Sequence, residues 1–429
     1  MLRFALLLLL TALAIGVIAA FIFFDIGTLH QYLPFYKLRP MHVSASVFWI
    51  FTAAQGGLYI YSSEYFKSEN KNPVLINISS IIWIITTLLI LFSFILGNFG
   101  GREYWEFPPV FAIPLLISWS LLAIHFFRLL LKTSGKFPVF IWMWGTGLVF
   151  FILTYVEANL WLFPWFRENI VRDITVQWKA NGAIVGSWNQ IVYGTAFYLM
   201  TKISGDESVA FKWQSFFFYF LGLTNLIFNW GHHTYNLPAA GWIRTVSYAI
   251  SMTEWIILIN IMQSFKSKLS EAKKFANLIP YRFLLASEFW VFVNLILAIL
   301  MSVPAINIYT HGTHITVAHA MGTTVGINSM ILFASIFYIF SKQDDQFIPK
   351  YKRSINIGFW VGNVSLVVFW IALIIAGIVK GYYTISQNLR FELTMQHVRP
   401  FLWVFAVAGV FVAASLALLS FILLKVKKK

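Results

Sequence analysis

Apolar stretches of about 20 residues recur along almost the whole chain, and this pattern constrains the fold more than any other feature. A helix needs a stretch of that length to cross the hydrocarbon core of a bilayer. We predict twelve such spans, over residues 4–24, 42–63, 74–97, 109–131, 138–163, 175–201, 211–233, 240–264, 283–304, 312–340, 354–379 and 399–424. The expected fold is therefore all-α, a polytopic membrane bundle of twelve helices that forms one domain over residues 1–429.

The composition indicates a surface that faces lipid rather than water. Hydrophobic residues make up 59% of the chain and charged residues 11%, whereas an ordinary soluble domain carries about 25% charged residues. This excludes a soluble enzyme, a nucleic-acid-binding protein and a disordered chain. Because the sequence has no cysteine, it also excludes disulfides, thiolate metal sites and iron–sulfur clusters.

The distribution of positive charge predicts the orientation in the membrane. Lys and Arg are concentrated in the loops on the side of the N-terminus, and the chain ends in a lysine-rich tail. By the positive-inside rule both termini are expected to be cytoplasmic. The first stretch is too long for the core of a signal peptide and lacks a clear cleavage site, so we predict that it is a span.

The sixth stretch, residues 175–201, is the least apolar of the twelve. It carries Lys179, Asn181, Asn189 and Gln190. Polar groups are expensive in hydrocarbon, so this helix is expected to face the interior of the bundle.

Histidines gather at the ends of the predicted spans on one side of the membrane. A lone histidine inside a membrane is usually a hydrogen-bonded structural residue, but several at one depth suggest a metal site, because imidazole suits iron, copper and zinc. By the alternation of the spans, the residues concerned lie in the outer half of the bilayer. They are His42, His232, His233, His311, His314 and His319.

The spacing of His319 and Met321 adds a second indication. Residues two apart on a helix project about 200° from each other, so one helix could present an axial ligand to a haem on each side. Histidine is the usual proximal haem ligand, and methionine is a known partner that raises the potential. A packing role for Met321 is the alternative.

Three sequence blocks carry a family resemblance. They are Trp230-Gly-His-His-Thr-Tyr, His311-Gly-Thr-His-Ile-Thr-Val-Ala-His and Gly101-Arg-Glu-Tyr-Trp-Glu. Together with the Leu38-Arg-Pro-Met-His block, they resemble the large catalytic subunit of bacterial nitric oxide reductases, within the haem–copper oxidase superfamily. The resemblance covers essentially the whole chain and implies a protein of the bacterial inner membrane.

The resemblance implies two haems and a non-haem metal. His42 corresponds to an axial ligand of a low-spin haem b, and His319 to the proximal ligand of a high-spin haem b. His232 and His233 correspond to two ligands of the non-haem iron, and Glu254 to a glutamate near that iron.

The outer-loop block implies further roles. Arg102 and Glu103 match residues that meet the haem propionates and a structural calcium ion, and Glu106 matches another acidic position of that loop. An ordinary surface ion pair between Arg102 and Glu103 is the alternative. Glu254 likewise has a purely structural alternative, as a hydrogen-bond partner inside its helix.

The chain departs from the family in its ligand set. The family's third iron-ligating histidine corresponds to Asn181, and two carboxylates that follow it correspond to Val185 and Asn189. The second haem ligand, two residues after His319, corresponds to Met321. An amide oxygen is a weaker, harder ligand than imidazole, so Asn181 would bind the metal less tightly or leave a more open position.

These departures leave the function open between several classes. The first expectation is reduction of two NO to N2O and water, and the alternative is a nitric oxide dismutase that forms N2 and O2 without external electrons. The dismutase tolerates lost carboxylates because it consumes no protons, but members of that group usually carry an extra N-terminal domain and two further helices, which we do not expect here. An O2-reducing terminal oxidase is disfavoured because the helix-6 tyrosine position is Val185, although Tyr219 keeps it open. A non-catalytic haem-binding sensor or electron conduit is the remaining class.

The implied partners are nitric oxide, the lipid membrane and, for a reductase, an electron donor. The chain has no motif for covalent attachment of a c-type haem, which would need cysteine. Electrons would therefore come from a separate c-type cytochrome subunit or from another donor at the outer face.

Overall fold

The computed structural model describes residues 1–24, 31, 33–67, 74–259, 275 and 278–426. Its described part is all-helical, at 86% helix, and contains no strand. The one β-type contact there is an isolated bridge between Arg102 and Trp105. The all-α prediction is confirmed.

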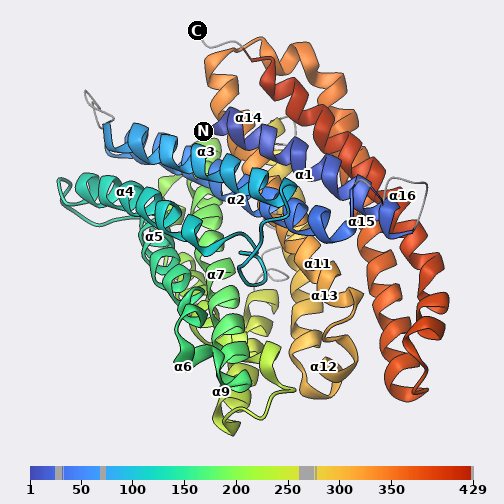
Figure 1. The fold of residues 1–429 in the computed structure, drawn as a ribbon. Helices are drawn as coiled ribbons and strands as arrows, with labels where there is room; N and C mark the ends of the chain where they lie inside the picture. The colour runs from blue at the N-terminus through green and yellow to red at the C-terminus, as the bar shows by residue number, and fades with distance from the viewer. Residues whose placement is uncertain (25–30, 32, 68–73, 260–274, 276–277, 427–429) are drawn as a thin grey trace. The chain divides into compact units, whose positions relative to one another are not determined.

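The chain divides into two compact units, residues 1–227 and residues 228–429. Figure 1 draws the helices in colours that run from blue at the N-terminus to red at the C-terminus. The single twelve-helix domain that we expected over residues 1–429 stays a prediction.

The first unit is built from long helices that pack in pairs. Its α1 lies along α2, α3 along α4, and α5 along α7. The helical segments are α1 (Leu2–Phe23), α2 (Phe35–Tyr65), α3 (Val74–Ile95), η2 (Pro109–Phe111), α4 (Ala112–Leu130), α5 (Val139–Glu157), η3 (Leu160–Leu162), α6 (Pro164–Arg167), α7 (Ile170–Ser204), η4 (Glu207–Phe211) and α8 (Trp213–Phe228).

Aromatic rings fill the core of this unit. Phe51 of α2 meets Trp119 of α4 edge to face at 5.4 Å between ring centroids and Phe151 of α5 at 4.9 Å. The rings of Trp119 and Phe151 stack at 4.0 Å. Such pairs contribute about 0.5–1.5 kcal/mol beyond simple burial, so they fix how these helices cross.

The second unit contains the later helices. Here α15 lies along α16, α11 along α14, and α13 along α15. The segments are η5 (Asn229–Thr234), α9 (Gly241–Met252), α11 (Ile279–Ser302), α12 (Pro304–Thr310), α13 (His314–Met321), η6 (Gly322–Ser329), α14 (Met330–Gln343), α15 (Phe347–Gly381), η7 (Tyr382–Ser386) and α16 (Phe391–Leu424).

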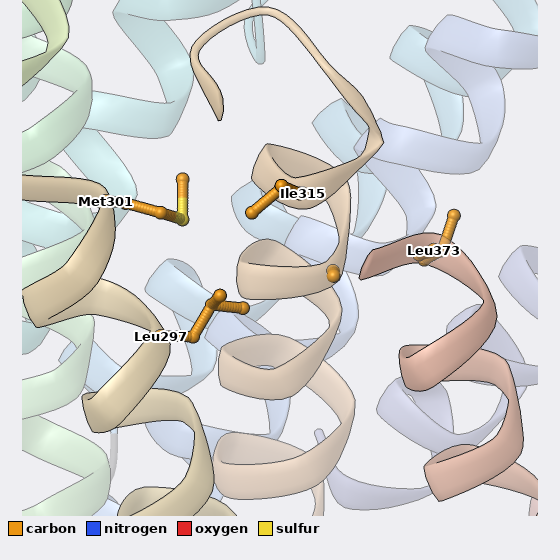
Figure 2. Packing of buried hydrophobic residues seen from close by; sticks show 5 residues of the cluster. Leu297, Met301, Ile315 and Leu373 are labelled. Carbon is orange, nitrogen blue, oxygen red and sulfur yellow. The ribbon is translucent and has the colours of Figure 1, made fainter. Parts of the chain in front are cut away.

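An apolar cluster joins three of these helices, as Figure 2 shows. Leu297 and Met301 of α11 face Ile315 of α13, and Leu373 of α15 closes the group. This cluster supports α13 from two sides and so fixes the helix that carries His319 and Met321.

Nine helices of the described residues are long and apolar enough to cross a membrane. The predicted spans 175–201, 211–233 and 240–264 lack such a helix. The helix α7 is long but polar, α8 has 16 residues and α9 has 12, while residues 260–264 lie outside the described part. The count of twelve spans therefore stays a prediction. The chain is a multi-pass membrane protein.

Two predicted spans differ from the observed helices in ways that affect the site. Helix α2 begins at Phe35, so His42 lies inside the helix rather than at its start. The span 312–340 is divided into α13, η6 and α14, and η6 is a π-helix. Segments of π-helix are rare and occur frequently at functional sites.

Candidate functional site

The adjacent histidines His232 and His233 lie in η5, the 3-10 turn that follows α8. Their Nε2 atoms are 3.1 Å apart, and their ring centroids are 4.3 Å apart. Two imidazole nitrogens at this distance either share a proton or face one metal ion. The structure thus has two convergent imidazole rings at a helix end, where the sequence placed the histidine pair.

Neighbouring helices hold the backbone of this turn. The Ser247 hydroxyl donates to the Asn229 carbonyl at 2.7 Å, and the Asn307 side-chain amide donates to the His232 carbonyl at 3.3 Å. A Cβ atom on Gly231 would lie 2.8 Å from Ser247 Cβ. Glycine is therefore needed for the turn to approach α9.

The other ring nitrogen of His232 is oriented by hydroxyl groups. Its Nδ1 lies 3.3 Å from Ser251 Oγ and 3.4 Å from Ser302 Oγ. Metal-ligating histidines typically use one nitrogen for such a partner and the other for the metal. The arrangement leaves Nε2 of His232 directed toward His233.

Two further histidines of the second unit lie near this pair. The His311 ring centroid is 6.4 Å from that of His233, and the His311 side chain hydrogen-bonds with the His233 backbone. His319 of α13 interacts electrostatically with His232, and its buried Nδ1 has no hydrogen-bond partner among the described residues. The described part of the chain holds no group of three or more His, Cys, Asp or Glu side chains that could bind a metal.

Met321 lies at the last residue of α13. Its side chain packs against the apolar cluster of Leu297, Met301, Ile315, Ala318 and Leu373. Since His319 and Met321 are both in α-helical conformation, they project about 200° apart, as the sequence predicts. The packing accounts for burial of the thioether, and its role as a haem ligand stays a prediction.

Glu254 lies just after α9, in the helical residues 254–259. The Asn229 side-chain amide hydrogen-bonds with its carboxyl group, and its Oε2 atom is buried without a hydrogen-bond partner among the described residues. Asn229 is three residues before His232. Ser251, which contacts His232, is near the end of α9, and the turn at Thr253 separates it from the helical residues that begin at Glu254. The Asn229 side chain thus connects the Glu254 carboxyl group to η5, the turn that carries the histidine pair.

In the first unit, His42 packs against α1. Its Nδ1 is 2.8 Å from the Ala12 carbonyl oxygen. A carbonyl only accepts, so Nδ1 donates and Nε2 keeps a free lone pair for a ligand bond. A Cβ atom on Gly16 would lie 2.6 Å from the His42 ring, so the absence of a side chain at Gly16 makes a cradle for the imidazole.

Asn181 lies in α7 and is 2% exposed. Neither its Oδ1 nor its Nδ2 has a hydrogen-bond partner among the described residues, which is costly for a buried amide. Two residues earlier, Lys179 pairs with Glu157 at the end of α5. Glu157, the carboxylate that α5 contributes near this part of α7, is therefore already paired with Lys179.

The loop between α3 and η2, which carries Arg102, is held by ion pairs from two helices. Arg102 donates to Asp173 of α7 at 2.7 Å and lies over the Trp161 ring at 4.8 Å. Arg39 of α2 pairs with Glu103 at 3.4 Å and also pairs with Glu106. Arg102 and Glu103 thus have different partners and do not form the surface ion pair that we considered as an alternative.

The environment of this loop shifts two pKa values upward. Burial raises the pKa of Glu103, against the opposing effect of Arg39. Burial and the nearby Glu103 carboxylate raise the pKa of Tyr104 to about 12. The loop thus places two carboxylates, Glu103 and Glu106, against the one guanidinium group of Arg39.

The predicted site residues fall into two groups. Within the second unit the structure brings together His232, His233 and His311, and Asn229 of the same turn bonds Glu254. Within the first unit it brings the loop residues together with α2 and α7. Pairings that draw on both units stay predictions; they are Asn181 with His232 and His233, and His42 with Met321. The sequence did not indicate Arg39, Asp173, Ser251 or Ser302, although Asp173 has a signal as an acidic residue in the first turn of a membrane helix.

Comparison with known proteins gives the family background. A family model described as cytochrome c and quinol oxidase polypeptide I matches residues 1–411. The cbb3-type cytochrome c oxidase subunit CcoN1 of Stutzerimonas stutzeri is 22% identical over 365 residues, which cover 81% of this chain and 75% of that protein. A nitric oxide reductase subunit of the same organism is 22% identical over 443 residues, which cover 95% of this chain and 90% of that protein.

A solved structure agrees with the fold. It is the cryo-EM structure of a haem–copper terminal oxidase dimer, and it matches with a TM-score of 0.76 at 16% sequence identity. The match covers 100% of this chain and 83% of that chain. At this identity the likeness establishes the fold alone.

Proposed function

The chain belongs to the cytochrome c and quinol oxidase polypeptide I family, and we propose that it is a membrane oxidoreductase that reduces two NO to N2O and water. One observation carries this proposal: His232 and His233 present their Nε2 atoms 3.1 Å apart, in the turn whose Asn229 side chain hydrogen-bonds the Glu254 carboxyl group. The match to a nitric oxide reductase subunit over 95% of the chain supports it.

Each unit by itself carries residues that suit the cofactors implied by the family. His42 and Met321 would hold a low-spin haem b and His319 a high-spin haem b, while Arg102 would meet the propionates. His232, His233 and Asn181 would hold a non-haem iron, and Glu103 would lie at a calcium ion. The fit rests on the lone pair left on His42 Nε2, the convergent histidine nitrogens and the unpartnered buried amide of Asn181. When bound, these groups supply the redox chemistry.

Glu254 is the proton carrier in this proposal. Reduction of two NO consumes two protons and two electrons, and the site must receive the protons through side chains or water. The Asn229 amide orients the carboxyl group, and the buried Oε2 is available to hold or pass a proton. A non-titrating residue at this position would remove that function.

The hydroxyl groups of Ser251 and Ser302 support the metal ligand. Both contact His232 Nδ1, and so keep its Nε2 toward His233. Asn181, with an amide in place of imidazole, would leave the metal a more open coordination position for NO.

An O2-reducing terminal oxidase is the less favoured alternative. Such enzymes use a tyrosine cross-linked to a metal-ligating histidine, and Tyr219 is the candidate for that tyrosine here. Its hydroxyl is instead 2.9 Å from Thr146 Oγ1 of α5, and the helix-6 position is Val185.

A nitric oxide dismutase is the second candidate, and one observation favours it. In α7, Val185 and Asn189 follow Asn181 and occupy the two positions at which the family has carboxylates. The nearby carboxylate of Glu157 pairs with Lys179. Conversion of two NO to N2 and O2 takes no protons, so a dismutase would not need proton-carrying carboxylates at these α7 positions.

Electrons for a reductase would reach the site from the outer face. We propose a c-type cytochrome subunit or another donor there, with both termini of this chain in the cytoplasm of a bacterial cell and the chain in its inner membrane.

The test uses the purified protein with an artificial electron donor and NO. The proposal expects NO consumption, and expects His232→Ala and His233→Ala to lose it together with the non-haem metal while haem stays bound. If those variants keep activity and metal content, the assignment of the site is wrong. Haem binding without NO turnover in the unaltered protein would indicate a sensor or an electron conduit.

A further inference from the structure

The helix that carries His319 changes its geometry immediately after Met321. There α13 gives way to the π-helix η6. A π-helix bonds each N–H to the carbonyl five residues back, so backbone acceptors at the junction lose their usual partners. Each such buried carbonyl needs a substitute donor.

Side chains supply the substitute donors around this junction. Thr324 Oγ1 donates to the Ala320 carbonyl, Asn328 Nδ2 donates to the Thr323 carbonyl, and Ser329 Oγ donates to the Thr324 carbonyl, each at 2.8 Å. These bonds stabilise the π-helix from within the same segment. The carbonyl of His319 differs from these because it also has a side-chain donor from another helix.

The His319 carbonyl accepts from the backbone N–H of Gly322, and a residue from another helix reaches it as well. Asn294 of α11 donates through Nδ2 to that oxygen at 3.2 Å and to Thr323 Oγ1 at 2.9 Å. Thr323 Oγ1 in turn donates to the same carbonyl at 3.1 Å. Asn294 is 2% exposed, and a buried amide in an apolar membrane helix is expensive unless it has such a task.

Glycine makes the approach of this amide possible. A Cβ atom on Gly322 would lie 2.4 Å from Asn294 Oδ1 and 2.6 Å from its Cγ. Gly322 is the first residue of η6. The amide of Asn294 therefore packs directly against the α-to-π junction and connects it to α11 through hydrogen bonds. We call this connection the clamp.

We propose that Asn294 is a positioning residue that sets the direction of the His319 side chain by clamping the His319 carbonyl at the α13–η6 junction. A π-turn contains one extra residue, so its loss would rotate α13 relative to α14 by about 100°. The clamp keeps that extra residue in place and thereby keeps His319 on its side of the helix. This inference rests on the proposed role of His319 as a haem ligand.

The test combines Asn294→Leu, Asn294→Ala and Gly322→Ala in the full chain. The readouts are haem content, the iron–histidine stretching band of the reduced high-spin haem, and its midpoint potential. We expect Asn294→Leu and Gly322→Ala each to shift the band and the potential while haem content is kept. Turnover is expected to fall by about tenfold to a hundredfold, as for other misplaced reacting groups.

A double-mutant cycle separates the clamp from general loosening of the bundle. In the Asn294→Ala background the added methyl group at Gly322 has room, so Gly322→Ala should then cause no further shift. The matched control is Asn363→Leu in α15. Asn363 accepts from Trp290, one turn before Asn294 on α11, at 3.2 Å, and it has no bond to the His319 carbonyl. The control should lower stability without moving the iron–histidine band.

The outcomes distinguish this inference from the proposed function. If His319→Ala keeps the high-spin haem, the assigned ligand is wrong and the proposed function fails with it. If His319→Ala loses that haem but Asn294→Leu and Gly322→Ala leave band and potential unchanged, only the clamp is refuted. Additive effects of Gly322→Ala and Asn294→Ala would refute it as well.

Discussion

The contact between Gly16 and His42 allows a quantitative test of how the first unit orients the proposed haem ligand His42. Gly16→Ala places a Cβ atom 2.6 Å from His42 Cε1 and 2.7 Å from His42 Nδ1. Real Cβ atoms essentially never lie closer than 3.0 Å to a neighbour. The imidazole must therefore move away from α1 and stretch or break its bond to the Ala12 carbonyl.

The expected cost follows from three contributions. Overpacking of a well-packed site costs about 1–3 kcal/mol, and loss of the bond to Ala12 costs about 1 kcal/mol. Alanine in place of glycine inside a helix offsets about 0.5–1 kcal/mol. The net destabilisation should be about 1–3 kcal/mol, and the displaced ring should no longer present Nε2 in its original direction.

The assay compares Gly16→Ala with Gly145→Ala. A Cβ atom on Gly145 in α5 would have its nearest neighbour at 3.6 Å, which is ordinary contact, so that variant should be neutral or slightly stabilised. Unfolding in detergent measures the stability, and the absorption of the low-spin haem measures ligation by His42. The reasoning is refuted if the two variants have the same unfolding midpoint and the same low-spin haem signal.

Three further predictions concern other parts of the molecule. Replacing both Ser251 and Ser302 by Ala removes the hydroxyls at the histidine Nδ1 and should weaken non-haem metal binding by about 10–100-fold, measured by competition with a chelator; an unchanged affinity would contradict the orienting role. Tyr219→Phe should cost about 1 kcal/mol through its lost hydrogen bond and leave NO turnover intact, whereas abolished turnover would point to an oxidase-type tyrosine. Hydrogen bonds from Ser208 lower the pKa of Asp206, so its contribution to stability is full above the usual Asp pKa and is lost as pH falls through the lowered pKa. Asp206→Asn should flatten the acid side of the curve of unfolding midpoint against pH, and a curve identical to that of the unaltered protein would contradict this.

The sequence predicted the long apolar helices well because a bilayer imposes a length and a composition that can be counted. It placed the ends of α3 and α4 close to where the structure has them. It predicted less well where polar function overrides hydropathy, as in α7, and where the helix changes type, as at η6. Hydropathy carries no signal for a π-helix, which depends on side-chain donors from several turns and from α11.

The same contrast holds for the candidate site. Convergence of His232 and His233 followed from their adjacency at a helix end, and the projection of His319 and Met321 on different sides followed from helical geometry. The partners that orient these residues come from distant positions, such as Ser302 for His232 and Ala12 for His42. Spacing within one segment does not indicate such contacts, although Asn294 in an apolar span is a polar residue that requires an explanation.

The most direct test of the central claim is an anaerobic incubation of the purified protein with isotopically labelled NO, followed by mass spectrometry of the gases. We predict no product without an electron donor, and labelled N2O once electrons are supplied. Labelled N2 together with O2 in the absence of a donor would contradict reduction and establish dismutation instead.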